Sequence, residues 1–208
     1  MTTNNIEATR VDLESSALTR LPIAFNGTER ELKARAYQVA NDPHSQALVL
    51  IHGDGPGVPI VRIQSGCVTG DIFHSLRCDC YEQLQSSLAD IVAADHGIML
   101  YLPYHEGRGI GLLNKIRAYA LQEEGLDTVD ANISLGEPVD ARDYDLAAHI
   151  LQDLNILAVR LLTNNPTKVQ GLEARGIEVA ERLPLVIAPN PHNETYLKTK
   201  KDRMSHSL

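Results

Sequence analysis

The order of hydrophobic patterns along the chain constrains its fold most strongly. Alternating or short buried apolar segments come first and predict strands at 32–39, 47–51 and 60–63, with a turn at 41–43 and a loop at 52–59. From residue 81 onwards, helical spacing alternates with short apolar segments. This part predicts helices at 81–94, from the glycine-rich loop 106–111 to residue 123, at 143–154, from 165–166 onwards and at 192–204, with strands at 98–102, 159–162, 177–179 and 185–187. Strands followed by β–α alternation predict an α/β fold. More specifically, they predict an α+β arrangement in which helices cover one mixed sheet.

Length and charge narrow the class of protein. With 208 residues the chain fits one domain, and we expect a polar, loosely held segment at 1–20 followed by a single domain at 21–208. The formal net charge of −8 argues against binding to nucleic acid or to an anionic membrane. No apolar segment approaches the ~18 residues that span a bilayer, and residues 1–10 lack the apolar stretch of a signal peptide. We therefore expect a cytoplasmic protein.

Three cysteines lie close together in the sequence, at Cys67, Cys78 and Cys80. An odd number of cysteines does not suit a disulfide framework, whereas the Cys-Asp-Cys spacing lets two thiolates face one ion. Three thiolates bind zinc readily and leave a fourth position for water, the arrangement of a catalytic site. The alternative is three buried thiols acting as small hydrophobic side chains, which the flanking charges of Arg77 and Asp79 disfavour. A closed metal site would need His74, Asp79 or His105 as a fourth ligand.

A glycine-rich loop, 106–111, precedes one predicted helix. Glycines before a helix let backbone N–H groups approach an anion, and Arg108 can contact a phosphate through two hydrogen bonds. Glycine-rich loops are also common without a ligand, and this loop does not follow the dinucleotide-binding fingerprint. From the loop alone, phosphate binding and an ordinary loop remain open.

Two other segments carry candidate chemistry. Thr163 follows a predicted strand at the place where α/β folds bind ligands, and Lys168 lies in the first turn of the next helix, where an anion would offset the unfavourable helix dipole. The alternative is a capped helix with a solvated lysine. Asp140 can relay a proton and Arg142 can stabilise phosphate charge. Acidic residues at a helix start are also commonplace, so a structural role stays open.

Taken together, these motifs closely resemble GTP cyclohydrolase II. The resemblance runs from about Arg62 to the C-terminus and is carried by residues 65–71, 75–80, 106–122, 127–132, 140–143, 162–166 and 190–194. It implies that 21–208 is a catalytic domain of the GTP cyclohydrolase II-like fold. It also implies a zinc-dependent homodimer that opens the imidazole ring of GTP and releases formate and pyrophosphate. The product would be 2,5-diamino-6-(5-phosphoribosylamino)pyrimidin-4(3H)-one, in the first step of riboflavin synthesis or a related pathway.

The resemblance assigns roles to individual residues. One zinc ion per chain would be held by Cys67, Cys78 and Cys80, and Mg²⁺ would accompany the triphosphate. Asp140 would accept a proton, Arg142 would attack the α-phosphorus or stabilise its charge, and Tyr119 would complete the second, deformylating hydration. The nucleotide would lie against Arg62, Ile63, Gln64, Ser65, Gly66, Gln83, Glu106, Gly107, Arg108, Thr128, Thr163 and Lys168.

The chain also departs from the family pattern. Members usually read Arg-x-His-Ser-Glu-Cys before the first ligand, whereas this chain has Gln64 and Gly66 at the histidine and glutamate positions. The stretch from Tyr101 to Arg108 is one residue longer, and His74 and Tyr81 replace small residues. These changes suggest an alternative, a divergent paralogue that acts on another purine nucleotide or serves azapteridine-like secondary metabolism. A non-catalytic nucleotide-binding regulator is an alternative of another class, which the complete catalytic set disfavours.

Overall fold

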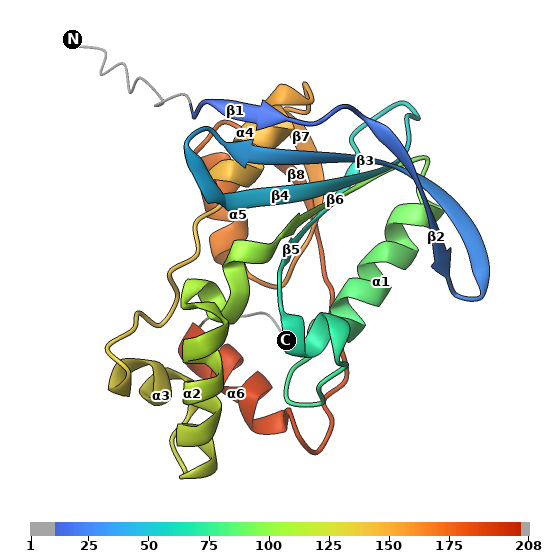
Figure 1. Ribbon diagram of the computed structural model, residues 1–208. Coiled ribbons are helices and arrows are strands. Elements are labelled where there is room, and N and C mark those ends of the chain that lie inside the picture. The colour runs from blue at the N-terminus through green and yellow to red at the C-terminus, as the bar shows by residue number, and fades with distance from the viewer. Residues whose placement is uncertain (1–10, 205–208) are drawn as a thin grey trace.

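A single mixed sheet of eight strands forms the centre of the molecule (Figure 1). The computed structural model describes residues 11–204. The strands lie in the order β1-β3-β4-β6-β5-β7-β8, and β2 pairs with β3 beside β1. Their bounds are β1 Leu13–Ser15, β2 Thr19–Phe25, β3 Thr28–Val39, β4 Asp42–Gly53, β5 Ile60–Ser65, β6 His96–Leu102, β7 Ala158–Leu162 and β8 Glu178–Leu183.

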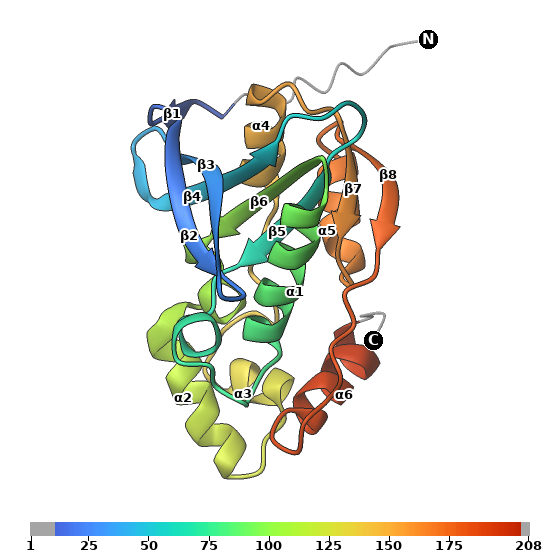
Figure 2. The ribbon, with the colours of Figure 1, turned by 90° about the vertical axis from the view of Figure 1, so that its right-hand side faces the viewer.

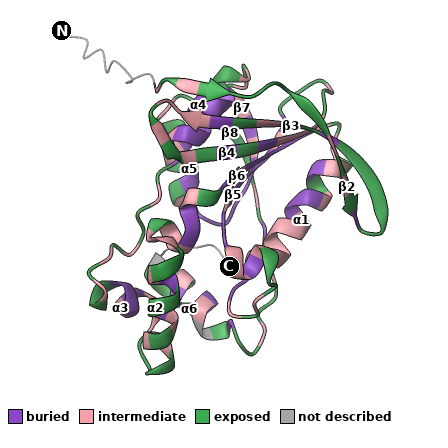
Figure 3. Ribbon diagram, viewed as in Figure 1, coloured by how far each residue is buried: buried purple, intermediate pink, exposed green. Residues whose placement is uncertain are grey.

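The sheet changes from antiparallel to parallel between β6 and β5. Strands β1 to β4 and β6 pair antiparallel, whereas β5 pairs parallel with both β6 and β7, and β7 pairs parallel with β8. Parallel central strands are covered on both faces, which explains their dense apolar composition. Figure 3 shows β5 and β6 as largely buried.

Helices cover the two faces of this sheet (Figure 2). Helix α1 (Cys80–Ala93) packs through Leu88 and Ile91 against Met99 of β6, while α4 (Asp145–Asp153) and α5 (Pro166–Glu173) pack on the other face against residues such as Ile98 and Leu161. Neighbouring residues of β6 thus belong to different cores, as the alternation of side chains along a strand requires.

A second group of helices lies beyond one end of the sheet. Strand β5 leads into the π-helix η1 (Val68–Ile72), and β6 leads through the 3₁₀ segment η2 (Pro103–Gly109) into α2 (Gly111–Glu123). Helix α3 (Thr128–Ser134) packs beside α2 at this end, and α6 (Glu194–Met204) packs against α3 (Figure 1). The carboxyl ends of β5, β6 and β7 therefore open towards one helical layer, the place where α/β folds bind ligands.

The fold class predicted from the sequence is confirmed, with local corrections. Residues 1–10 lie outside the described residues, but 13–15 and 19–20 of the predicted loose segment pair with β3. Residues 185–187 do not form a strand, because the side-chain amide of Asn164 bonds both the carbonyl and the N–H of Leu185 in place of a neighbouring strand. The predicted turn at 41–43 is earlier, since β4 already begins at Asp42. Strands β1 and β2 and helix α3 were not predicted.

None of the described helices is both long and apolar enough to cross a membrane. The extent of the domain, 21–208, stays a prediction.

Gly97 lets helix α1 approach strand β6. A Cβ atom at this position would lie 2.6 Å from the carbonyl oxygen of Ile91 and 2.9 Å from its Cα. Because these are backbone atoms, they cannot move aside as a flexible side chain does. We expect Gly97→Ala to lower the free energy of unfolding by about 1–3 kcal/mol and Gly97→Val to lower it further, measured by urea titration. Unchanged midpoints in both variants would contradict this packing.

Candidate active site

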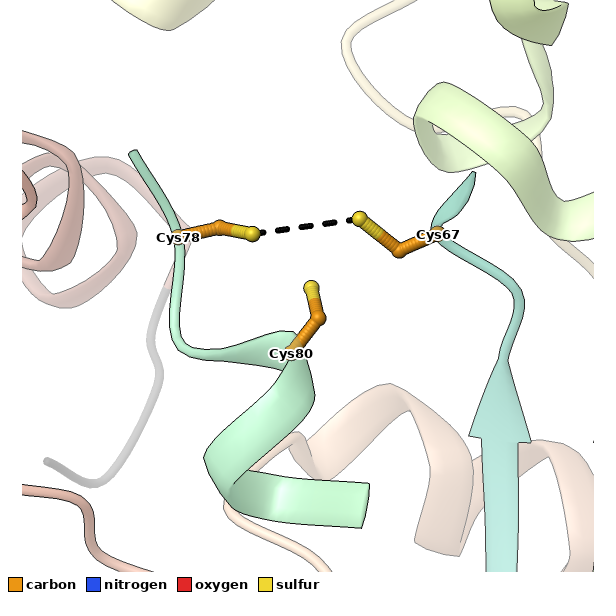
Figure 4. A group of neighbouring side chains, drawn as sticks. All are labelled: Cys67, Cys78 and Cys80. Carbon is orange, nitrogen blue, oxygen red and sulfur yellow. Dashed lines mark hydrogen bonds between the residues drawn. The ribbon is translucent and has the colours of Figure 1, made fainter. Parts of the chain in front are cut away.

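The three predicted cysteines converge on one point (Figure 4). Cys67 follows β5, Cys78 lies in the loop after η1, and Cys80 is the first residue of α1. Their sulfur atoms all lie within 4.8 Å of one another, and the Sγ atoms of Cys67 and Cys78 are 3.8 Å apart. Gly70 of η1 makes this approach possible, since a Cβ there would lie 3.0 Å from the Cys78 sulfur and 3.1 Å from that of Cys67. The trio can therefore hold a metal ion.

A buried lysine favours the thiolate at one corner of this trio. The Nζ atom of Lys115, on α2, lies 3.0 Å from the Cys67 sulfur and 2.6 Å from Oε1 of Glu106. Hydrogen bonds with Cys78 and Cys80, together with the Lys115 ammonium, lower the pKa of Cys67, while the hydrogen bond to Cys67 raises the pKa of Cys78 to about 11. Of the Cys67 and Cys78 thiols, that of Cys67 is thus deprotonated first.

Glu106 connects the glycine-rich loop to the segment that follows β5. Its Oε2 atom accepts a hydrogen bond of 2.6 Å from the backbone N–H of Val68, and its Oε1 atom accepts one from Gly107 in addition to the Lys115 ammonium. Both charged side chains are only 9% exposed. The loop and the cysteine segment are therefore joined by a buried ion pair.

The glycine-rich loop has a left-handed backbone at several positions. Gly107, Gly109 and Gly111 have positive φ, and Arg108 between them has φ 64°, an uncommon angle for a residue with a side chain. The Nη1 and Nη2 atoms of Arg108 are buried without a hydrogen-bond partner in the described protein. A guanidinium with buried, unused donors is suited to an anion.

Two adjoining pockets meet at this loop. We call the first the thiol pocket; it is lined by Ser65, Gly66, Cys67, Arg77, Cys78, Cys80, His105, Glu106, Gly107, Arg108, Ile110, Lys115, Ala118, Tyr119, Gln122, Thr128, Asn132, Arg142 and Tyr196. We call the second the cation pocket; it is lined by Arg62, Gln64, Ser65, Asp79, Cys80, Gln83, Arg108, Arg142, Thr163, Asn164, Asn165, Lys168, Tyr196 and Lys200. Since Ser65, Cys80, Arg108, Arg142 and Tyr196 line both, one elongated ligand can occupy both pockets.

Positive charge exceeds negative charge in the cation pocket. Its lining contains five Arg or Lys side chains but one carboxylate, that of Asp79. Burial lowers the pKa of Arg62 to about 10, and burial together with neighbouring cations lowers the pKa of Lys168. The Nζ atom of Lys168 donates to the carbonyl of Ile63, at 2.6 Å. Such a concentration of cations out of water favours a polyanionic ligand.

Arg142 lies in a chain of polar groups between the two pockets. Its Nε and Nη2 atoms donate to the two carboxylate oxygens of Asp140, at 2.8 and 2.5 Å, and its Nη1 donates to the Ser65 hydroxyl at 3.3 Å. The Ser65 Oγ atom lies 3.2 Å from Nδ1 of His105. Burial, then the neighbouring cations Arg142 and Lys168, lower the pKa of His105 to about 3, so its ring is neutral at pH 7.

Most of the predicted site residues come together, with two exceptions. Ile63 lines neither pocket, because its side chain is fully buried in the core and its carbonyl alone faces Lys168. Asp140 reaches the site through Arg142 and is not part of either lining.

The residues that depart from the family pattern have partners of their own. Gln64 accepts two hydrogen bonds from Arg62, and the rings of His74 and Tyr81 stack on each other at 3.8 Å.

Sequence reasoning missed several lining residues. Tyr196 and Lys200 come from α6, which the pattern predicted only as a polar terminal helix. Lys115, in the helix predicted after the glycine-rich loop, pairs with Cys67 and Glu106. The family-like motif at 190–194 is the one sequence signal that points to α6 as part of the site. The lysines of this helix give no such signal, because lysines in a charged helix are usually exposed to solvent.

Comparisons with known proteins agree with one another. A family model described as GTP cyclohydrolase II matches residues 15–184. The chain is 48% identical over 201 residues to a GTP cyclohydrolase-2 from Streptomyces coelicolor, covering 96% of this chain and 88% of that protein. It is 46% identical over 197 residues to a GTP cyclohydrolase-2 from Picrophilus torridus, covering 93% and 98%. A riboflavin biosynthesis protein RibBA from Rhodococcus erythropolis is 53% identical over 156 residues, which cover 75% of this chain but 37% of that longer protein.

The structure makes a clear prediction for Gly66. A Cβ atom there would lie 2.9 Å from the Cα of Pro103 and 3.1 Å from the carbonyl oxygen of Leu102, both backbone atoms of the longer loop. We expect Gly66→Ala to lower the free energy of unfolding by about 1–3 kcal/mol, and Gly66→Glu by at least as much, measured by urea titration. The exposed Leu157→Ala serves as the control and should change stability by less than about 0.5 kcal/mol. A Gly66→Glu variant as stable as the wild type would show that the loop yields readily.

Proposed function

The chain belongs to the GTP cyclohydrolase II family, and from that premise we propose that it opens the imidazole ring of GTP. It is a hydrolase of this type in riboflavin biosynthesis. The proposed products are formate, pyrophosphate and 2,5-diamino-6-(5-phosphoribosylamino)pyrimidin-4(3H)-one. One observation carries the proposal. The three cysteine sulfur atoms line the thiol pocket, which adjoins the cation pocket with its five Arg and Lys side chains.

Zinc is the ion that we propose for the cysteine trio. Three thiolates are a soft donor set that zinc accepts, and the pocket beside them leaves room for a further ligand. When bound, zinc supplies a Lewis acid that polarises the attacking water at the guanine C8 atom. Mg²⁺ would enter with the triphosphate, since the described residues group potential ion ligands only at the cysteines.

Arg142 acts in this proposal as a fixed positive charge for the leaving pyrophosphate. Although burial lowers the pKa of Arg142, its hydrogen bond with Asp140 outweighs this, and the pKa is raised. A guanidinium held in its protonated form is a poor nucleophile but a good stabiliser of phosphate charge. Of the two roles considered for Arg142, the electrostatic one is therefore favoured over attack on the α-phosphorus.

Asp140 and Tyr119 supply the proton-handling groups. The hydrogen bond from Arg142 overcomes the effect of burial and lowers the pKa of Asp140, so its carboxylate is ionised at neutral pH and can accept a proton. Burial raises the pKa of Tyr119 to about 12, which keeps its phenol protonated. The Tyr119 hydroxyl lies 3.4 Å from that of Thr69, beside the thiol pocket. We propose that it assists the hydration that releases formate.

The remaining predicted contacts divide between the two pockets. We propose that those in the thiol pocket contact the base and ribose, and that those in the cation pocket contact the phosphates. Gly66, Glu106, Gly107 and Thr128 line the first, Arg62, Gln64, Gln83, Thr163 and Lys168 line the second, and Ser65 and Arg108 line both.

A homodimer and a reducing compartment complete the proposal. Exposed apolar side chains at the end of η1 and on α2, among them Phe73, which follows η1, at 75% and Leu113 at 66% exposure, are suited to burial against a second copy. Sedimentation of the purified chain at twice its monomer mass would support this. Three free thiols used as ligands require a compartment such as the cytoplasm, where thiols stay reduced.

The activity test uses the zinc-loaded protein with GTP and, separately, with ATP and ITP. We expect one formate and one pyrophosphate per GTP, faster than with the other nucleotides. Cys78→Ser should lose the metal ion and formate release together, because one of three ligands is removed. The exposed Leu76→Ala in the same loop serves as the matched control.

Each other outcome identifies an alternative. Faster turnover of another purine nucleotide would support the divergent paralogue that Gln64 and Gly66 suggest. Nucleotide binding without formate release would support the regulator. Full activity without metal would contradict the zinc proposal.

The two roles considered for Arg142 differ in whether a nucleotide becomes covalently bound to the enzyme during turnover. In the electrostatic role, Arg142→Gln lowers kcat by about 100- to 1000-fold, Arg142→Lys loses less, and KM changes little in both. Asp140→Asn should likewise act on kcat. Intact-mass measurement during wild-type turnover should find no nucleotide covalently bound. A guanylyl adduct lost in Arg142→Lys would instead establish arginine as the nucleophile.

A further inference from the structure

Helix α6 adds to the site two residues that no motif assigned. Tyr196 lines both pockets, and Lys200 lines the cation pocket. The match to the family model ends at residue 184, before this helix begins. Figure 2 shows α6 beyond the end of the sheet, on the opposite side from α2, with α3 between them.

Charged contacts hold α6 in place at both ends of the site. Lys200 Nζ lies 2.7 Å from Oδ1 of Asp79, whose side chain is 1% exposed and which separates the two cysteines of the Cys-Asp-Cys motif. Arg203 pairs with Asp127 and Asp130 of the α3 region at 2.5 and 3.0 Å. Leu197, 7% exposed, is the buried apolar side chain of this helix in the part whose burial is described. The Lys200–Asp79 pair is buried, whereas the pairs of Arg203 are partly exposed, so the position of α6 depends in part on the charge of Lys200 and its surroundings.

Tyr196 covers the unused cation of the glycine-rich loop. Its ring lies 5.6 Å from the guanidinium carbon of Arg108 and 4.5 Å from Nζ of Lys200. The Nη1 and Nη2 atoms of Arg108 are buried but have no hydrogen-bond partner among the described residues. These donors are therefore available to a ligand that enters the pocket beside the ring. An anion placed there would be bound at low dielectric, where its attraction to Arg108 is strongest.

The cations around α6 repel one another when no anion is present. Burial lowers the pKa of Lys168, and the neighbouring cations Arg62, Arg142 and Lys200 lower it further. The Asp79 and Asp140 carboxylates offset two charges of the five that line the pocket. A bound polyphosphate removes the remaining repulsion, so it stabilises the position of α6 that the structure shows.

We propose that α6 is a closing element of the nucleotide site, in which Tyr196 forms the wall over Arg108 and the bound nucleotide. Lys200 is a positioning residue that ties this wall to Asp79 in the metal-binding loop. The inference rests on the proposed function, because it extends the same nucleotide site by two residues. It adds that nucleotide binding and the ordering of α6 are thermodynamically linked.

The test compares variants of the full-length zinc-loaded protein. Tyr196→Ala should raise KM for GTP by about tenfold with a smaller change in kcat, since a cation–aromatic wall is lost. Tyr196→Phe keeps the ring and should raise KM less. Lys200→Gln should raise KM and make α6 exchange amide hydrogens faster, whereas the exposed Lys201→Gln on the same helix is the matched control. Zinc content, measured per chain, should equal that of the wild type in the Tyr196 variants.

A second measurement does not depend on turnover. Adding guanosine 5′-(α,β-methylene)triphosphate, a non-cleavable analogue, should slow hydrogen exchange across 194–204 in the wild type, and much less in Lys200→Gln. Unchanged exchange on binding, or wild-type KM in both Tyr196→Ala and Lys200→Gln, would overturn the role of α6 while leaving the proposed function intact. A wild-type protein that neither binds the analogue nor converts GTP would instead overturn the proposed function and this inference with it.

Discussion

The buried ion pair between Lys115 and Glu106 joins the parts on which the site depends. Lys115 comes from α2, Glu106 from the segment after β6, and their shared neighbour Cys67 from the end of β5. Burying two charges is costly unless they are paired and hydrogen-bonded, and here Val68 and Gly107 also donate to the carboxylate. Removing either partner would leave an unpaired charge in the interior beside the thiols. The pair therefore holds the glycine-rich loop against the cysteine segment in one arrangement.

The same region contains two opposite electrostatic environments within a short distance. At the cysteines, hydrogen bonds among the thiols and the Lys115 ammonium lower the pKa of Cys67 and favour its thiolate, a form suited to a cation. In the cation pocket, the excess of Arg and Lys over carboxylates favours a polyanion. Ser65 and Arg142 lie where the two meet. A nucleoside triphosphate has a neutral base at one end and a concentrated negative charge at the other. Its triphosphate therefore matches the cation pocket, and its base matches the thiol pocket.

Two departures from the family pattern, Gly66 and the longer loop, lie against each other. Gly66 allows the backbone at Pro103 to approach, and the longer loop of which Pro103 is part brings His105 to the Ser65 hydroxyl. The lowered pKa of His105 means that this ring adds no charge to an already cationic site. The loss of a carboxylate at position 66 and the gain of a neutral imidazole nearby are therefore linked by packing.

Several features could be predicted from the sequence because they depend on local pattern. Apolar periodicity predicted the main helices and strands, and the spacing of Cys67, Cys78 and Cys80 predicted a shared ion site, since thiolates two residues apart can face the same ion. The glycines around Arg108 predicted the loop that precedes α2. Other features depend on contacts between segments far apart in the chain. Three such contacts are the pairing of Lys115 with Cys67, the approach of Gly66 to Pro103 and the position of Tyr196 over Arg108. The sequence pattern does not predict them, because a long polar side chain is indistinguishable in the sequence from one exposed to solvent. The sequence by itself determined which chemical groups are present and on which elements they lie; the tertiary structure alone decided which of them share a pocket, because burial and charge pairing arise only when the sheet and the helices beyond its end come together.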